Sequence, residues 1–138
     1  MSEHPARLAA QQSVAAVMAG DKDTWLGLFA PDAIVQDPIG PSFFDESGEG
    51  HRGTDAISAF WDQAIGPNSI DFRIRESYAC GEECANLFTI ITTLPTGDKV
   101  TVEGVATYKV NSEGRLEWLR AFWQQEDATF EPAPAAGG

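Results

Sequence analysis

The spacing of apolar residues changes once along this chain, and that change constrains the fold more than any other feature. In roughly the first 65 residues, apolar side chains recur every three or four positions, as on one face of an α-helix. From Ile70 onward they alternate with polar side chains, as along a half-buried β-strand. Helices followed by a run of strands predict an α+β domain, with the helices packed on one face of a curved, mostly antiparallel sheet.

Three helices are expected in the first half. Gly20 is suited to end the first of them, and Asp21 and Thr54 are suited to the N-cap positions of the other two. A short strand before Asp37-Pro38 ends there because proline cannot continue a hydrogen-bonded ladder. The spacing predicts helices over residues 5–19, 22–30 and 55–65, and the short strand over residues 33–36.

Four strand-like runs follow, separated by segments rich in glycine, proline and asparagine that are typical of turns. The last run is apolar or aromatic on both faces: Leu119, Ala121 and Trp123 share one face, and Trp118, Arg120 and Phe122 share the other. A strand of this kind is buried on both sides, so we expect the face with Trp118 to meet a second copy of the chain in a homodimer. The runs cover residues 70–78, 85–94, 99–110 and 116–125.

The length of 138 residues fits one domain, which we place at residues 1–130. Residues 131–138 are rich in proline, alanine and glycine and are expected to form a flexible tail. The loop over residues 41–53 is longer than most connections and carries Phe43 and Phe44, which are expected either to cover a ligand or to pack into the core.

The charge balance excludes several classes of function. The chain has 9 Lys and Arg against 21 Asp and Glu, a net charge of −12, so its surface repels nucleic-acid phosphates and anionic lipids. It has no apolar stretch of the ~20 residues that a membrane span needs, and we expect a cytoplasmic protein. Cys80 and Cys84 are expected to be ordinary residues flanking a turn, since two cysteines make a poor metal site. No metal and no cofactor is expected.

Asp37 is the residue best suited to carry chemistry. It follows Ile34 and Val35 and precedes Ile39, so apolar neighbours flank it on both sides. Partial desolvation would raise its pKa and make it a better general base. The alternative is a turn aspartate that accepts a backbone N–H, since Asp-Pro is a common turn dipeptide.

Five segments of the chain resemble the ketosteroid isomerases, a family of the nuclear-transport-factor-2-like, or SnoaL-like, superfamily. Asp37-Pro38-Ile39-Gly40 is the most specific part of the resemblance. It implies a cone-shaped sheet around a deep apolar pocket, a steroid-like ligand and no cofactor. In that family an aspartate moves a proton from the carbon beside a ketone to a carbon two positions away. The segments are residues 14–21, 35–40, 53–61, 108–114 and 119–123.

The resemblance carries over only part of the family's catalytic apparatus. The shuttling aspartate corresponds to Asp37, whereas the tyrosine and the protonated aspartic acid that hold the ligand oxygen correspond to Ser13 and Ala106. Ser13, Tyr108 and Trp123 are the candidates for donating a hydrogen bond to a ligand. The positions expected to line the pocket are Ile39, Phe60, Ala106, Leu119 and Ala121.

These replacements predict weak or altered isomerase activity. Losing one preorganised donor to a developing oxyanion costs about 3–4 kcal/mol, so losing both lowers the rate by roughly 10⁴-fold or more if the effects add. The alternative is a binding or carrier module of the same fold in which Asp37 only bonds a ligand hydroxyl or caps a turn. A polyketide cyclase or an epoxide hydrolase of the superfamily would need Asp37 to have a polar partner, and the inferred pocket offers few.

Overall fold

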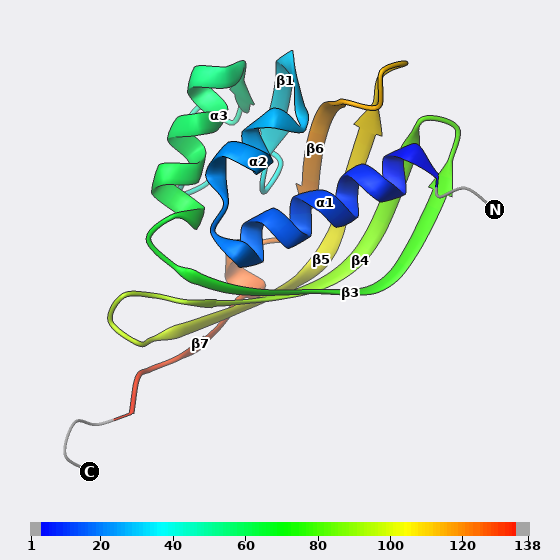
Figure 1. Ribbon diagram of the computed structural model, residues 1–138. Coiled ribbons are helices and arrows are strands. Elements are labelled where there is room, and N and C mark those ends of the chain that lie inside the picture. The colour runs from blue at the N-terminus through cyan, green and yellow to red at the C-terminus, as the bar shows by residue number, and fades with distance from the viewer. Residues whose placement is uncertain (1–3, 135–138) are drawn as a thin grey trace.

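A computed structural model describes residues 4–134 and places the helices on one side of a strongly curved sheet (Figure 1). Among these residues, the strands form one sheet in the order β2-β1-β6-β5-β4-β3, and β7 pairs with β5. The predicted α+β class and the curved, unclosed sheet are confirmed. The elements are α1 (Pro5–Ala19), α2 (Lys22–Gly27), β1 (Phe29–Gln36), β2 (His51–Arg52), α3 (Thr54–Phe60), η1 (Trp61–Ile65), β3 (Ser69–Cys80), β4 (Glu83–Thr93), β5 (Lys99–Val110), β6 (Leu116–Phe122), η2 (Gln125–Asp127) and β7 (Thr129–Glu131).

Helix α1 crosses the concave face of β3, β4 and β5 (Figure 1). It begins and ends where the sequence predicts, and Gly20 terminates it in the left-handed conformation with φ of 69°. Its buried face consists largely of alanines together with Ser13, whereas the larger Leu8 and Met18 are exposed. Small residues let the helix axis come close to the sheet, so α1 closes one side of the concave surface without filling it.

Helix α2 is shorter than predicted because the chain enters strand β1 at Phe29. Pro31 therefore lies in β1, whose pairing with β6 is irregular between Phe29 and Ile34. Beyond that irregularity β1 runs parallel to β6, with Val35 opposite Leu119. This pairing places Asp37, two residues after Val35, beside the end of β6.

Helix α3 begins at Thr54 and not after it, and Gly53 occupies the N-cap position with no side-chain hydrogen bond. The prediction that Thr54 caps this helix is therefore wrong. The helix continues over Trp61–Ile65 as a wider π-helical turn, whose hydrogen bonds span one residue more than those of the α-helix that the sequence pattern predicts. Phe60 and Trp61 are buried where the two parts meet.

The strands β3, β4, β5 and β6 form the predicted antiparallel meander. Strand β6 ends at Phe122, earlier than predicted, and the chain then turns through η2 into β7, which no sequence pattern indicated. Strand β7 pairs with the start of β5, with Lys99 opposite Glu131. Residues 135–138 of the predicted tail lie outside the described residues, and the mobility of the tail stays a prediction.

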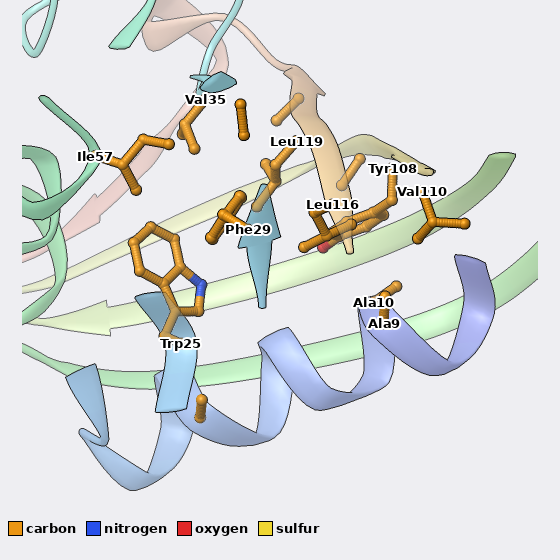
Figure 2. Close-up of a cluster of buried hydrophobic side chains, with 14 of the residues drawn as sticks. Ala9, Ala10, Trp25, Phe29, Val35, Ile57, Tyr108, Val110, Leu116 and Leu119 are labelled. Carbon is orange, nitrogen blue, oxygen red and sulfur yellow. The ribbon is translucent and has the colours of Figure 1, made fainter. Parts of the chain in front are cut away.

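The core lies between the sheet and the helices α1, α2 and α3, and Figure 2 shows part of it, including Trp25, Phe29 and Leu116. Trp25 is its largest fully buried side chain, and its ring lies 4.8 Å from that of Phe29 and 5.2 Å from that of Trp61. These contacts join α2, β1 and η1. No helix among residues 4–134 has both the length and the apolar character needed to cross a membrane.

Gly104 in β5 provides a test of how closely the strands pack. A Cβ atom at this position would lie 2.1 Å from the carbonyl oxygen of Phe122 and 3.2 Å from the ring of Phe88. Gly104→Ala should therefore lower the free energy of unfolding by about 1–3 kcal/mol in urea titrations. The control is Gly27→Ala, where a Cβ meets open space at the end of α2 and the stability should stay unchanged or rise. Equal stabilities for the two variants would contradict the packing described.

Candidate functional site

A cavity of about 380 Å³ lies between the helices and the concave face of the sheet. This volume is within the usual range for sites that bind small molecules. Its wall is mostly apolar, which favours a ligand with a large hydrocarbon surface. The sheet contributes Ile70, Phe72, Ile90, Val100 and Val102 to the wall, and α1 contributes Val17.

Asp37 lines this cavity at the end of β1, so the structure brings the predicted base to an apolar pocket. The indole N–H of Trp123 donates to its Oδ1 at 2.6 Å. Burial raises the pKa of the Asp37 carboxyl above its ordinary value of 3.8, while the Trp123 hydrogen bond and the charge of His51 offset part of the rise. The site therefore holds a carboxyl group that binds a proton more readily than an exposed aspartate does.

Ser13 also lines the cavity, from the buried face of α1. Its Oγ accepts a hydrogen bond of 3.1 Å from the indole N–H of the buried Trp25. Because that contact uses an oxygen lone pair, the Ser13 hydroxyl hydrogen stays available for an acceptor in the cavity. The sequence pattern gave no sign of Trp25 as the partner of Ser13, since the two residues lie on different helices.

The other predicted donors are placed differently from Ser13. Trp123 lines the cavity, but its N–H is engaged by Asp37. Tyr108 is buried in the core near Val110 and Leu116 and contributes nothing to the cavity wall (Figure 2). Burial, together with the negative charge of Asp37, raises the pKa of the Tyr108 phenol, so it stays protonated at neutral pH.

The residues predicted to line the pocket divide into two groups. Phe60 and Leu119 are in the cavity wall. Ile39, Ala106 and Ala121 are not in the wall, and the two alanines are buried. The backbone N–H of Ile39 instead bonds the carbonyl of Ala121 at 3.0 Å, which ties the segment after Asp37 to β6.

The long loop after β1 contributes the aromatic pair Phe43 and Phe44 to the cavity wall. Phe44 packs edge-on against Phe60, while Phe43 is 75% exposed. The Asp45 carboxylate holds the loop by accepting backbone N–H bonds from Gly48 and Gly50, and these bonds lower its pKa. Phe44 thus packs against the core, the second of the two roles expected for the pair, while both rings line the cavity.

Two polar residues of β4 escaped the sequence analysis. Cys84 and Asn86 are both about 1% exposed and face inward, so Cys84 is more than a residue that flanks a turn. Alternation along β4 could have placed Asn86 on the inner face, because Phe88 and Ile90 share its parity. Within residues 4–134, no group of three or more His, Cys, Asp or Glu side chains is placed to hold a metal ion.

An open, curved sheet that encloses an apolar cavity with an acid at its wall defines a class of small-molecule-binding α+β domains. Comparison with known sequences narrows this class, because the SnoaL-like domain family matches residues 10–118. The chain belongs to the SnoaL-like family and is ketosteroid-isomerase-like within it. The predicted resemblance is thereby confirmed.

Similar proteins of known identity support this assignment. The chain is 27% identical over 119 residues to a steroid Delta-isomerase of Nocardioides simplex, covering 86% of this chain and 89% of that protein. The Delta 5-3-ketosteroid isomerase from Mycobacterium sp. superposes with a TM-score of 0.90 at 37% identity over 93% of this chain and 99% of that one. RV0760c from Mycobacterium tuberculosis, solved with estradiol-17beta-hemisuccinate, gives a TM-score of 0.89 at 33% identity over 93% and 100%.

The raised pKa of Asp37 predicts a specific dependence of stability on pH. The folded carboxyl binds its proton more tightly than the unfolded one, so the free energy of unfolding falls as the pH rises from about 4 through the raised pKa. Asp37→Asn removes this loss and should raise the free energy of unfolding at neutral pH by about 0.5–2 kcal/mol. Urea titrations at several pH values measure both effects.

The matched control for this prediction is Asp23→Asn, because Asp23 is exposed in the first turn of α2. The free energy of unfolding of Asp23→Asn should depend on pH in the same way as that of the original protein. A lower stability of Asp37→Asn at neutral pH, or an unchanged pH dependence, would contradict the desolvation of Asp37.

Proposed function

We propose that this protein binds a steroid or a similar flat polycyclic ketone or phenol in its cavity and that Asp37 shuttles a proton to move a double bond. The observation that carries the proposal is the single desolvated carboxyl in an otherwise largely apolar wall. The isomerases among the similar proteins, and the estradiol derivative bound to one relative, support the same class of ligand. We further propose that the protein acts in the cytoplasm, which suits its acidic surface.

In the proposed reaction, the Asp37 carboxylate takes a proton from the carbon beside the ketone, and the electron pair moves onto the ketone oxygen. The resulting carboxylic acid returns the proton to the carbon two positions away, which shifts the double bond and restores the base. A raised pKa favours the first step, because it makes the carboxylate a stronger base towards the substrate carbon. The Trp123 N–H holds the carboxylate in one orientation during the transfer.

The oxygen that gains negative charge in this reaction needs hydrogen-bond donors. Ser13 offers a hydroxyl at the cavity wall, but Ala106 offers none. We therefore expect turnover that is slower than that of isomerases with a tyrosine and a carboxylic acid at these positions, by about 10²- to 10³-fold for the donor missing at Ala106.

Turnover of a 3-oxo-Δ5-steroid, followed by the absorbance of the conjugated enone, tests the proposal. The rate should exceed that of buffer and should rise with pH through one ionisation above the ordinary pKa of aspartate. Asp37→Asn should lower kcat/KM by at least about 10²-fold, the usual contribution of a general base. Asp23→Asn should leave it unchanged. A rate equal to that of buffer that Asp37→Asn does not alter would exclude the catalytic role.

A carrier function is the second candidate, and the alanine at position 106 favours it, because a binding protein needs no donor matched to a transient charge. Titration of the same steroid under conditions without turnover separates the two candidates. Tight binding with no reaction selects the carrier, whereas the absence of both binding and reaction excludes both.

We also propose a homodimer that forms through the outer face of β6. The Trp118 ring on this face lies between two cations, with the Lys109 ammonium 5.6 Å and the Arg120 guanidinium 5.9 Å from its centre. Phe122 is 52% exposed, and the buried indole N–H of Trp118 has no hydrogen-bond partner within the described chain. An exposed aromatic surface of this kind is typical of protein interfaces.

Phe122→Glu tests the proposed interface. Sedimentation equilibrium should give a dimer for the original protein and a dissociation constant at least 10-fold higher for the variant, since the new carboxylate would be desolvated in the contact. Phe130→Glu serves as the control, because Phe130 is equally exposed but lies on β7, away from this face. A monomeric original protein, or equal dissociation by the two variants, would contradict this interface.

A further inference from the structure

The sheet wall of the cavity is apolar except at one position of β4. Thr92 shares the inner face of this strand with Ile90, because side chains at every second position point to the same side. It pairs with Ile70 on β3 and with Val100 on β5, and all four residues lie in the cavity wall. Among the described residues of β3, β4 and β5 that line the cavity, Thr92 is the one with a polar side chain.

The Thr92 hydroxyl is accessible and unengaged. Thr92 is half-buried, its oxygen can be reached by a water molecule, and it has no hydrogen-bond partner within residues 4–134. Asn68, which also lines the cavity, is in a similar state. Its Nδ2 donates to the carbonyl oxygen of Ala64 at 2.9 Å, while its Oδ1 is accessible and has no partner in the same part of the chain. The cavity wall therefore keeps hydrogen-bonding groups that the fold itself does not use.

The register of the sheet brings these two residues near each other. Ser69 pairs with Thr93, and Ile70 pairs with Thr92. Continued by one residue, this register sets Asn68 diagonally across from Thr92, a relation in which two residues are about 7–8 Å apart. Both side chains reach the same cavity, so one ligand oxygen placed between them can contact both.

Thr92 and Ser13 lie toward opposite ends of the cavity. Helix α1 begins at the turn between β3 and β4, where His4 Nε2 lies 2.8 Å from the carbonyl oxygen of Gly81. Nine residues of helix, about 14 Å, lead from His4 to Ser13, whereas nine residues of strand, about 30 Å, lead from Glu83 to Thr92. Thr92 is thus on the order of 15 Å farther from this turn, measured along the sheet. In Figure 1 this end of β4 extends beyond α1.

The charge of the wall indicates which kind of oxygen the outer end accepts. No lysine, arginine or histidine is among the described residues that line the cavity, and the chain has a net charge of −12. An anionic group would therefore be disfavoured there. A threonine hydroxyl and a carboxamide can each donate and accept, so they suit a neutral hydroxyl or ketone.

We infer that Thr92 and Asn68 form a second polar subsite, which binds a hydroxyl or ketone oxygen at the outer end of the ligand, while the Ser13 hydroxyl faces the oxygen at the inner end. This inference rests on the proposed function and narrows its ligand class to elongated polycyclic ketones with a neutral oxygen at both ends. The two residues determine specificity and take no part in the proton transfer at Asp37.

The test compares testosterone with androst-4-en-3-one, which lacks only the 17-hydroxyl group. Both already carry the conjugated ketone that the proposed reaction forms, so binding is measured without turnover. Trp25 and Trp123 line the cavity, and their fluorescence reports the titration. Thr92→Val removes the hydroxyl and keeps the shape of the side chain. It should lower the ratio of the two association constants, testosterone over androst-4-en-3-one, by about 5-fold, because it weakens the binding of testosterone alone.

The matched control is Thr93→Val, the same substitution on the opposite face of β4, which should leave the ratio unchanged. Asn68→Ala should lower the ratio as Thr92→Val does. The double variant should lower it by less than the product of the two single effects, because both residues contact one oxygen. A change in stability of any variant affects both steroids equally and cancels in the ratio.

Ser13→Ala tests the orientation of the ligand. Both steroids carry the 3-oxo group, so this variant should weaken the binding of both by the same factor and keep the ratio of the original protein. An unchanged ratio in Thr92→Val, or a lowered ratio in Ser13→Ala, overturns this inference and leaves the proposed function standing. If the original protein binds neither steroid, the proposed function fails, and this inference fails with it.

Discussion

Desolvation of the Asp37 carboxyl is the interaction on which the rest of this site depends. An ionised carboxylate in an apolar wall is unfavourable, and the protein offsets only part of that cost with the Trp123 hydrogen bond and the charge of His51. The part of the desolvation cost that is not offset raises the pKa of Asp37, and a proton shuttle needs a raised pKa. The same side chain is thus a cost to stability and, in the proposed reaction, the base.

The shape of the scaffold leaves Asp37 half-buried in the cavity wall. Small residues on the buried face of α1 bring the helix close to the sheet, while the curvature of β3, β4 and β5 keeps the concave surface away from α3 at the other end. The cavity lies between these regions, and Phe43 and Phe44 contribute to its wall. The core adjoins this space, because Trp25, Phe60 and Leu119 belong to the hydrophobic cluster and also line the cavity.

Two polar side chains of the cavity wall, Ser13 and Asp37, are each held by the indole N–H of a tryptophan. Trp25 donates to the Ser13 oxygen and so leaves the hydroxyl hydrogen available. Trp123 donates to one oxygen of Asp37 and leaves the other without a side-chain donor. A neutral donor and a single carboxyl in a largely apolar wall suit the ligand class proposed above.

The amino-acid sequence by itself determined the class of the fold, because the change of apolar period at about residue 66 is a local property that each segment carries with it. It also predicted that Asp37 is partly desolvated, since the apolar residues that flank this aspartate adjoin it in the chain. It did not show the π-helical turn at Trp61, the pairing of β7 with β5, or the partners of Ser13 and Asn86. The tertiary structure alone decided these features. For β7 and Ser13 the physical reason is that the partner lies on another element of the chain, β5 and α2 respectively, and the order of residues does not record which elements meet in space.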